Sequence, residues 1–305
     1  MKLLTVGTVA FDTVESPYGK VERTVAGSCM YSAWSASFFI QSVGMISIIG
    51  DDFPEEELHT LEKRGVSTAG IQRIRGAKSF YWHGRYHPDM IHRDSVVTEL
   101  NVLENFRPQL PDDYTTTPYI LLGNLTPTVQ QQVIDQLAEH TTRLVVLDTM
   151  DYWIKHSLEE LKRAIALADV LSINDEEARL LSGERSLVVA AAKILQWGPS
   201  YLIIKKGEHG AFLFSSDDIF FVPALPLAVV KDPTGAGDTF AGGFLGYLAA
   251  TDDTSFNNMK RAMVYGSAMA SFVVEEFGLQ RLKSLTRDEI QQRVLKFKDL
   301  VSFNL

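Results

Sequence analysis

Short apolar runs rich in β-branched residues alternate with longer amphipathic segments along most of the chain. The runs predict strands and the segments predict helices, because apolar side chains recur with a different period in each structure. The predicted strands are Leu3–Phe11, Met45–Ile49, Tyr119–Leu122, Leu144–Asp148, Val170–Ile173, Leu202–Lys205, Ala211–Phe214 and Ile219–Val222. The predicted helices are Ser28–Gln41, Pro54–Arg64, Pro127–His140, Ser157–Ala168, Glu176–Leu181, Leu187–Gln196, Gly237–Ala250, Phe256–Glu276 and Thr286 to about Phe303. Repeated strand–helix units predict an α/β fold with a doubly wound, mostly parallel sheet flanked by helices.

Two stretches interrupt this alternation, and both read as antiparallel ribbons. Residues 13–25 contain the turn sequence Pro17-Tyr18-Gly19 and then alternate apolar with polar side chains. Residues 78–100 also alternate, with Phe80, Trp82 and Gly84 on one face of a strand and Tyr81, His83 and Arg85 on the other. Either ribbon could instead bury its aromatic face for stability alone.

A small sheet made of the two ribbons is expected to lie over the C-terminal edge of the main sheet, where ligands bind in open α/β folds. This predicts a core of residues 1–12, 26–76 and 101–305, and an inserted β-sheet lid of residues 13–25 and 77–100.

Charge and cysteine content narrow the partners and the compartment. The 305 residues include 29 Lys and Arg against 38 Asp and Glu, a net charge of −9, which argues against nucleic acid as a partner. The longest apolar stretch, 219–230, contains two prolines and is too short to span a bilayer, so no membrane partner is expected. Cys29 is the only cysteine, which excludes an intrachain disulfide and favours a reducing, cytoplasmic location.

The segment Asp232–Gly243, with the sequence DPTGAGDTFAGG, carries the clearest chemistry. Its glycine-rich turn follows a strand-like run and opens a helix, so the backbone N–H groups of Gly235, Ala236 and Gly237 can point together at an anion. Asp238 lies beside this turn, where a carboxylate can accept the proton of an attacking hydroxyl, as phosphoryl transfer requires. The structural alternative is a tight turn that only caps the helix.

Other nucleotide-binding motifs are absent from the sequence. Neither GxxxxGKS nor GxxxxGKT occurs, which excludes a Walker-type phosphate loop. Gly7-Thr8-Val9-Ala10, at the first strand, lacks the GxGxxG pattern of dinucleotide-binding folds.

On these residues the chain resembles the ribokinase-like (PfkB) carbohydrate kinases. The family's C-terminal signature, DxTGAGD followed by an aromatic and small residues, matches Asp232–Gly243, with Pro233 where a hydroxyl residue is common. Further matches are Gly50-Asp51-Asp52, the NxxE element at Asn174–Glu177 and the glycine loop Lys205–Gly210. The N-terminal signature differs: Ala26-Gly27-Ser28 and then Tyr31 stand where a Gly-Gly pair and an Asn are expected. The resemblance spans nearly the whole chain and implies a ribokinase-like fold.

The resemblance also implies roles for the matched residues. Asp238 is expected to be the catalytic base, and Gly235, Ala236 and Gly237 to stabilise charge on the transferred γ-phosphoryl group. The expected nucleotide-binding residues are Asn174, Lys205, Gly207, Gly210 and Thr234, and those expected to orient Mg²⁺ are Glu177, through water, and Asn174. The expected substrate-binding residues are Asp12, Gly27, Ser28, Tyr31 and Arg85.

Each of these roles has a plainer structural alternative. Asn174 could cap the helix that follows it, Asp12 could cap a loop, and Lys205 could pair with Glu208. Cys29 is expected to be a small packing residue rather than a nucleophile.

The resemblance predicts an ATP- and Mg²⁺-dependent kinase that phosphorylates a hydroxymethyl group of a small sugar. Nucleosides are the leading alternative, and a vitamin-like aromatic alcohol is a third, since Phe11, Tyr31, Tyr81 and Trp82 could stack on a planar ring. The non-enzymatic alternative is a regulator that binds a sugar or nucleotide. Exposed strand edges on the ribbons predict a homodimer formed through the lid. A requirement for a monovalent cation near Asp232 is left open.

Overall fold

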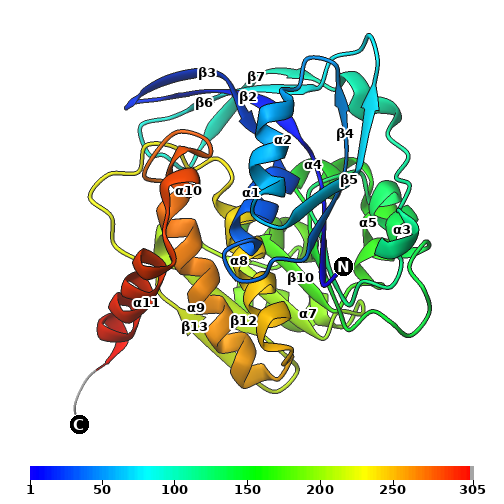
Figure 1. Ribbon diagram of the computed structural model, residues 1–305. Coiled ribbons are helices and arrows are strands. Elements are labelled where there is room, and N and C mark those ends of the chain that lie inside the picture. The colour runs from blue at the N-terminus through cyan, green and yellow to red at the C-terminus, as the bar shows by residue number, and fades with distance from the viewer. Residues whose placement is uncertain (303–305) are drawn as a thin grey trace.

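A nine-stranded sheet crosses the computed structural model, which describes residues 1–302 (Figure 1). In spatial order its strands are β13 (Ile219–Val222), β12 (Ala211–Phe214), β11 (Tyr201–Lys205), β10 (Val170–Asn174), β9 (Leu144–Asp148), β8 (Tyr119–Leu122), β1 (Leu3–Val6), β4 (Val43–Gly50) and β5 (Val66–Ile74). Neighbouring strands run parallel from β11 to β5, while β12 and β13 are antiparallel additions at one edge. The central strands are buried on both sides, as in sheets that helices cover on both faces.

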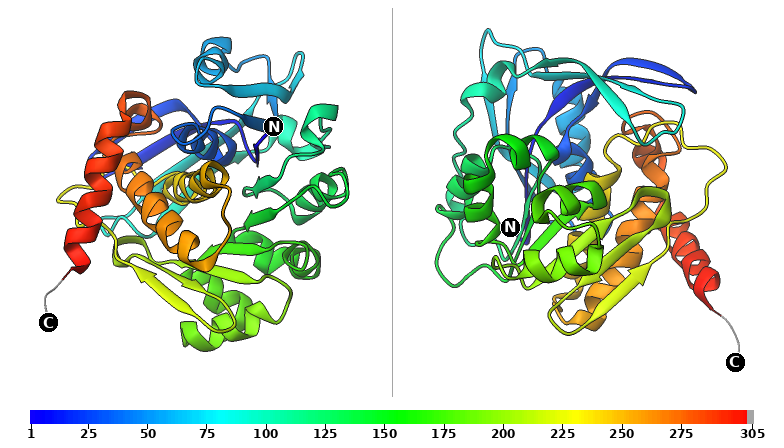
Figure 2. Two further views of the ribbon diagram at one scale, coloured as in Figure 1. Left: turned by 60° about the horizontal axis from the view of Figure 1, so that its bottom comes forward. Right: turned by 180° about the vertical axis from the view of Figure 1, so that it is seen from behind.

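Helices cover both faces of this sheet, and each layer buries its own hydrophobic cluster (Figure 2). One layer contains α1 (Ser28–Ala36), α2 (Glu55–Glu62), α8 (Ala236–Thr251), α9 (Phe256–Val273), α10 (Gln280–Ser284) and α11 (Arg287–Val301). The other contains α3 (Pro127–Ile134), α4 (Asp151–His156), α5 (Leu158–Ile165), α6 (Asp175–Ser182) and α7 (Leu187–Leu195). None of the helices in residues 1–302 is long and apolar enough to cross a membrane.

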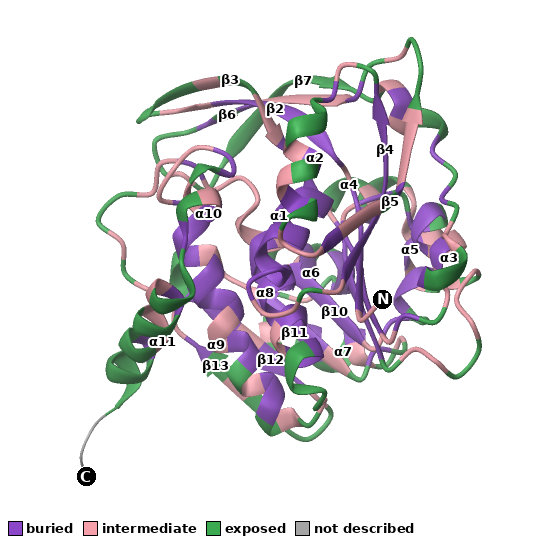
Figure 3. Cartoon of the chain, viewed as in Figure 1, coloured by how far each residue is buried: buried purple, intermediate pink, exposed green. Residues whose placement is uncertain are grey.

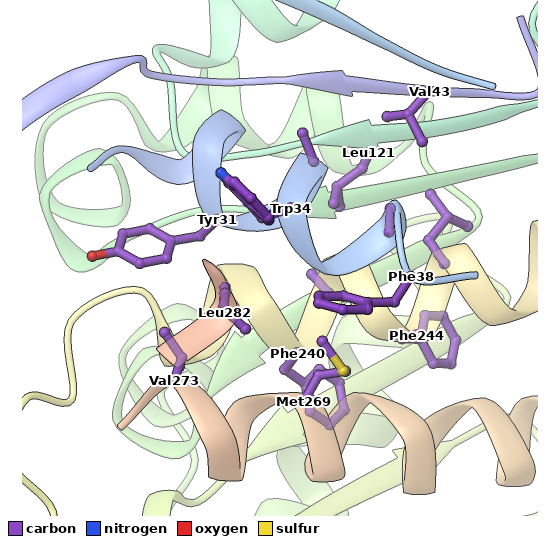
Figure 4. Close-up of a cluster of buried hydrophobic side chains, with 14 of the residues drawn as sticks. Tyr31, Trp34, Phe38, Val43, Leu121, Phe240, Phe244, Met269, Val273 and Leu282 are labelled. Atoms are coloured by element: carbon purple, nitrogen blue, oxygen red, sulfur yellow. The ribbon is translucent and has the colours of Figure 1, made fainter. Parts of the chain in front are cut away.

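The packing of α1 against α8 fixes where α8 begins. Both helices are largely buried (Figure 3), and Trp34, Phe38, Phe240 and Phe244 fill the space around them (Figure 4). A side chain at Gly246 would lie 2.9 Å from Ala36 Cα, so glycine lets the two helices approach closely. The N-terminus of α8 is therefore held rigidly against the core.

A second, four-stranded sheet stands apart from the first (Figure 1) and has the order β3 (Gly19–Ala26), β2 (Ala10–Ser16), β6 (Phe80–Tyr86), β7 (Arg93–Glu99). We call this four-stranded sheet the lid. The hairpins β2–β3 and β6–β7 are antiparallel, but β2 and β6 pair in parallel. The lid is therefore a mixed sheet made of two antiparallel ribbons.

The predicted class is confirmed: the fold is α/β, with a large, mostly parallel sheet flanked by helices and a small separate sheet. The predicted strand Leu3–Phe11 is wrong as a single element, because β1 ends at Val6 and β2 begins at Ala10 in the lid. The chain turns between them at Gly7, where a Cβ would lie 2.9 Å from the backbone N of Cys29. The short segment 7–9 thus carries the chain directly from the main sheet into the lid.

The strand β5 and the α-helices α4 and α10 were not predicted. β5 is an edge strand with polar and glycine positions, Val-Ser-Thr-Ala-Gly-Ile-Gln-Arg-Ile, so it lacks the apolar run that marked the central strands. Several predicted helices end too late, such as Pro127–His140, whose helix α3 ends at Ile134. The predicted end of the last helix at Phe303 lies outside the described residues; α11 is described to Val301.

Candidate active site

The turn before α8 is locked in place by a buried carboxylate. Asp232 is 1% exposed, and its Oδ1 and Oδ2 accept the backbone N–H groups of Thr234 (2.9 Å) and Gly278 (3.0 Å). Gly235 has φ 76°, and a Cβ there would lie 2.5 Å from the ring of Tyr31, so the position requires glycine. Within residues 1–302, the N–H groups of Gly235 and Gly237 donate to no backbone carbonyl or side chain, whereas the N–H of Ala236 donates to the Pro233 carbonyl at 3.2 Å, so the prediction that Ala236 N–H is free for an anion is wrong. The turn therefore presents free N–H groups at a helix N-terminus, as anion binding requires.

A buried ion pair lies beside this turn. Lys205, the last residue of β11, donates to Asp148, the last residue of β9, across 2.7 Å between Nζ and Oδ2. The Lys205 amine is also next to α8: a Cβ at Gly237 would lie 3.2 Å from Nζ. Parallel strands bring these groups together, because β9, β10 and β11 all end at the same edge of the sheet.

Asp238, in the first turn of α8, lies among these charges. Burial, and secondarily the nearby carboxylate of Asp148, raises the pKa of Asp238 to about 7, with the Lys205 ammonium acting against both. A carboxylate with a pKa near neutrality is suited to accept and release a proton.

A third carboxylate reaches the same place from the lid. Asp12, in β2, is 6% exposed, and burial followed by repulsion from Asp232 and Asp238 raises its pKa to about 8. Asp12 is paired through its backbone with β3 and β6, but its carboxylate makes no hydrogen bond with any residue of the described chain. An acceptor group of this kind, buried and unpaired, is free to bind hydroxyl groups.

Two hydrogen bonds hold the lid on the turn before α8. Tyr86 Oη, in β6, lies 3.1 Å from Thr234 Oγ1, and Ser16 Oγ, in β2, donates to the Lys231 carbonyl across 2.7 Å. The lid therefore packs against the anion-binding turn, and it brings Asp12 close to that turn.

Asn174 and Glu177 form a complete capping box at the start of α6. Asn174 Oδ1 accepts the N–H of Glu177 at 2.7 Å, and Glu177 Oε2 accepts the N–H of Asn174 at 2.8 Å. Burial, and secondarily Asp148, raises the pKa of Glu177 to about 7, with Lys205 acting against both. The helix-capping alternative is therefore correct for Asn174, and each side chain keeps one terminal atom for another partner.

The described residues contain no group of three or more acidic, histidine or cysteine side chains that could hold a metal ion alone. Glu177 Oε1, which the capping box leaves free, suits a Mg²⁺ ion, or a water bound to it, that takes its other oxygen ligands from water and phosphate.

Arg85 does not join this group. It lies on the opposite face of the lid from Asp12, where its Nε donates to Glu15 at 2.7 Å, and His83 contacts the same carboxylate at 3.0 Å. Tyr31 packs beneath Gly235 and shapes the turn.

Gly27 and Ser28 lie at the start of α1, close to β2, but the N–H of Ser28 is already used. It donates to Thr8 Oγ1 at 2.9 Å, so it is not free for a substrate hydroxyl. Gly27 has φ 109°, and its Cβ position is blocked by the Thr8 carbonyl, which makes glycine necessary there.

Gly207 and Gly210 lie in the loop after β11, where the 3₁₀ turn Gly207–His209 begins. Both have positive φ, 52° and 91°, and Lys206 N–H donates to the Gly210 carbonyl at 2.8 Å. The glycines shape a tight loop next to Lys205. Lys205 does not pair with Glu208, whose one ion-pair partner in the described structure is His209, at 3.9 Å.

Two residues of the site were missed in the sequence, Asp148 and Tyr86. Asp148 had a usable signal, because it ends a predicted strand at the ligand-binding edge of the sheet. Tyr86 had none, since its contact with Thr234 joins residues far apart in the sequence.

Fold and site together define a phosphotransferase of the ribokinase-like class: an open α/β sheet, a lid, and a glycine turn with a carboxylate at a helix N-terminus. Residues 3–286 match the family model described as pfkB family carbohydrate kinase, and the chain belongs to this family.

The chain is similar to several characterised relatives. It is 28% identical over 254 residues to the cytidine kinase of Thermococcus kodakarensis, an alignment that covers 80% of this chain and 87% of that one. A putative ribokinase II from E. coli, in complex with ATP and Mg²⁺, superposes with a TM-score of 0.78 at 19% identity, covering 97% and 99% of the two chains. The aminoimidazole riboside kinase of Salmonella enterica superposes with a TM-score of 0.77 at 20% identity, covering 96% and 100%.

Proposed function

We propose that this kinase transfers the γ-phosphoryl group of ATP to a hydroxymethyl group of a small sugar or of the sugar part of a nucleoside. One observation carries the proposal: Asp238, whose pKa is raised to about 7 by burial, lies directly after the free N–H groups of Gly235 and Gly237. A hydroxyl bound between Asp238 and that turn can lose its proton to the carboxylate while it attacks phosphorus.

In this proposal the chain acts mainly by placing charges. The free N–H groups of Gly235 and Gly237 donate hydrogen bonds to the transferred group, and Asp12 binds other hydroxyls of the acceptor. The nucleotide lies along the carboxyl ends of β10 and β11, and the residues proposed to bind it are Asn174, Lys205, Gly207, Gly210 and Thr234. Mg²⁺ supplies positive charge to the phosphates when bound, with Glu177 and Asn174 contacting it or its water ligands.

The acceptor screen is the direct test of this proposal. ADP release is measured with free pentoses and hexoses, nucleosides and hydroxymethyl heterocycles, each with wild-type protein and with Asp238→Asn. We expect turnover with at least one class and about 10³-fold or greater loss in Asp238→Asn, whose shape is nearly unchanged. Binding of ligands with no ADP release from any acceptor would instead support a binding regulator.

A nucleoside is the acceptor that one further observation favours. All four aromatic candidates have contacts within the chain: Phe11 packs on Phe53 at 5.4 Å between tilted rings, Tyr31 packs under Gly235, Tyr81 donates to Thr13 at 3.0 Å, and the Arg93 guanidinium lies 5.9 Å from the Trp82 ring centroid. Trp82 differs in position, because it is the register partner of Asp12 and lies on the same face of the lid.

The Trp82 ring lies over Gly84, where a Cβ would collide with it, and its Nε1 donates to Ser95 at 3.0 Å. The indole is thus held flat against the lid, next to the carboxylate proposed to bind sugar hydroxyls.

We expect Trp82→Ala to raise KM for nucleosides about tenfold with little effect on free-sugar turnover, since a ring stacked on an aromatic contributes about 1–3 kcal/mol. His83→Ala, on the other face of the same strand, is the control, and equal effects of both variants would count against stacking on Trp82.

A monovalent cation beside Asp232 remains a prediction. Both carboxylate oxygens of Asp232 already accept backbone N–H groups, so a cation there would share them. Equal rates in potassium and tetramethylammonium salts would dismiss the requirement.

We also propose a homodimer through the lid and a cytoplasmic location. The support for the dimer is the outer strand β7, which is exposed along its whole length and carries Val96 and Val97 at 44% and 37% exposure. Sedimentation equilibrium distinguishes a dimer from a monomer.

A further inference from the structure

The position of the Lys205 amine is unusually well defined. Its side chain is 17% exposed, that of Asp148 is 10% exposed, and the two are joined at 2.7 Å. The amine also lies 3.2 Å from the Cβ position of Gly237, at the first turn of α8. The amine therefore lies beside the turn whose Gly235 and Gly237 N–H groups have no partner in the described chain.

Lys205 is surrounded by carboxylates on both sides of the proposed reaction path. Burial lowers the pKa of Lys205, but the charges of Asp148, Glu177 and Asp238 raise it by more. Asp238 belongs to the acceptor side and Glu177 to the nucleotide side, so the amine lies between the two groups that exchange the phosphoryl.

The neighbouring residue, Lys206, serves as the comparison for Lys205. Lys206 directs its amine over the ring of Phe212, 5.7 Å from the centroid, and pairs with no carboxylate in the described chain. The two lysines thus have the same charge and adjacent positions but different surroundings.

We propose that Lys205 contacts the transferred phosphoryl group itself, and that Asp148 is a positioning residue that holds the amine until this group arrives. The inference rests on the proposed function and goes beyond it by assigning Lys205 to the γ-phosphoryl rather than to the nucleotide in general. As charge spreads over the phosphoryl oxygens, the ammonium gains attraction in the transition state that it lacks in the free enzyme. The amine then exchanges its contact with Asp148 for one with phosphate, and no bond to nitrogen is made or broken.

The primary experiment compares Lys205→Met with Lys206→Met. We expect Lys205→Met to lower kcat about 10²–10³-fold, the size of effect seen when one charge-stabilising donor is removed, with KM for the acceptor changed by less than about threefold. Lys206→Met is expected to stay within about threefold of wild type. Lys205→Arg, which keeps the charge, is expected to recover part of the loss.

Nucleotide affinity is a measurement that would not change if Lys205 only stabilised the fold. Titration calorimetry is carried out with a non-hydrolysable ATP analogue and with ADP. We expect Lys205→Met to raise the Kd of the triphosphate about tenfold and to leave the Kd of the diphosphate almost unchanged. Equal weakening of both would place Lys205 elsewhere on the nucleotide and overturn the inference.

A double-mutant cycle tests Asp148. If Asp148 acts through Lys205, Asp148→Asn lowers kcat in the wild-type background but has little further effect in Lys205→Met. Additive losses would overturn the positioning role.

The inference and the proposed function fail in different ways. Lys205→Met with normal kcat, alongside inactive Asp238→Asn, refutes the role of Lys205 and leaves the proposed function intact. Full activity in Asp238→Asn refutes the proposed base.

Discussion

At the scale of single residues, the site contains buried carboxylates whose ionised forms are unfavourable in the fold but are the forms that the proposed reaction uses. Burial raises the pKa of Asp238 to about 7 and that of Asp12 to about 8. Each carboxylate therefore binds a proton more tightly in the folded chain than in the unfolded chain, where its pKa is near 4. The ionised forms that catalysis needs are the ones that weaken the fold.

We expect activity to rise with pH through about 7, because Asp238 accepts a proton only when ionised. The measurement is kcat against pH between 5.5 and 9 on the preferred acceptor. A rate that falls as pH rises through 7 would contradict the role of Asp238 as a base.

The same shift predicts the stability of Asp238→Asn. A raised pKa means that ionisation costs stability in full above the folded pKa of about 7, and that this cost declines as the pH falls from there towards the unfolded pKa near 4. At pH 8 we expect the neutral variant to be more stable than wild type by about 1–3 kcal/mol, with the difference shrinking towards pH 5. Thermal melts at the two pH values check this, and a destabilised variant at pH 8 would be the opposite result.

Gly237→Ala distinguishes the effect of this glycine on the stability of α8 from its effect on activity. Alanine favours a helix over glycine by about 1 kcal/mol, so the melting temperature should not fall. Its Cβ would lie 3.2 Å from Lys205 Nζ, and we expect the displaced amine to lower kcat about tenfold. In the Lys205→Met background the same change should have little effect, because there is no amine to displace.

At the scale of elements, two hydrogen bonds join the lid to the segment before α8, and one of them joins a tyrosine hydroxyl to a threonine hydroxyl. Tyr86→Phe removes the 3.1 Å contact with Thr234 and should cost only about 0.5–1.5 kcal/mol of stability. We expect KM for the acceptor to rise severalfold, because Asp12, which is proposed to bind the acceptor, belongs to the same sheet as Tyr86. Tyr18→Phe, on the exposed turn of the lid, is the matched control and should behave as wild type.

The sequence predicted the elements better than it predicted which face of the lid meets the site. Strict alternation separated Trp82 from His83 and Arg85, and the structure confirms that these side chains lie on opposite faces. Alternation cannot say which face is inward, because that depends on how the lid packs on residues 231–234. Arg85 was therefore assigned to the substrate although it pairs with Glu15 on the outer face.

Local patterns worked where the chemistry itself is local. The glycine turn and Asp238 are adjacent in the sequence, so their arrangement could be predicted from helix geometry. The pair Lys205–Asp148 joins residues 57 positions apart, and only the strand order brings the two strand ends together. β5 escaped prediction because an edge strand need not be apolar on both faces.

At the scale of the whole molecule, a chain with a net charge of −9 binds a polyanion. The free N–H groups of the turn and the Lys205 amine attract phosphate only at short range, whereas the net charge repels ATP at long range. We expect KM for ATP to fall modestly, by about twofold, as salt rises from low to physiological strength, because the repulsion is screened first. A steep rise in KM over this range would show instead that exposed cations draw the nucleotide in.

The short segment between β1 and β2 has a consequence for turnover. It joins two sheets without a flexible linker, so the carboxylate of Asp12 travels with the lid while Asp238 stays with α8. In the proposed function the acceptor is bound from both sides, by Asp12 of the lid and by Asp238 of α8. A movement of the lid away from α8 would withdraw Asp12 from the product, so opening of the site and release of the product would be the same event.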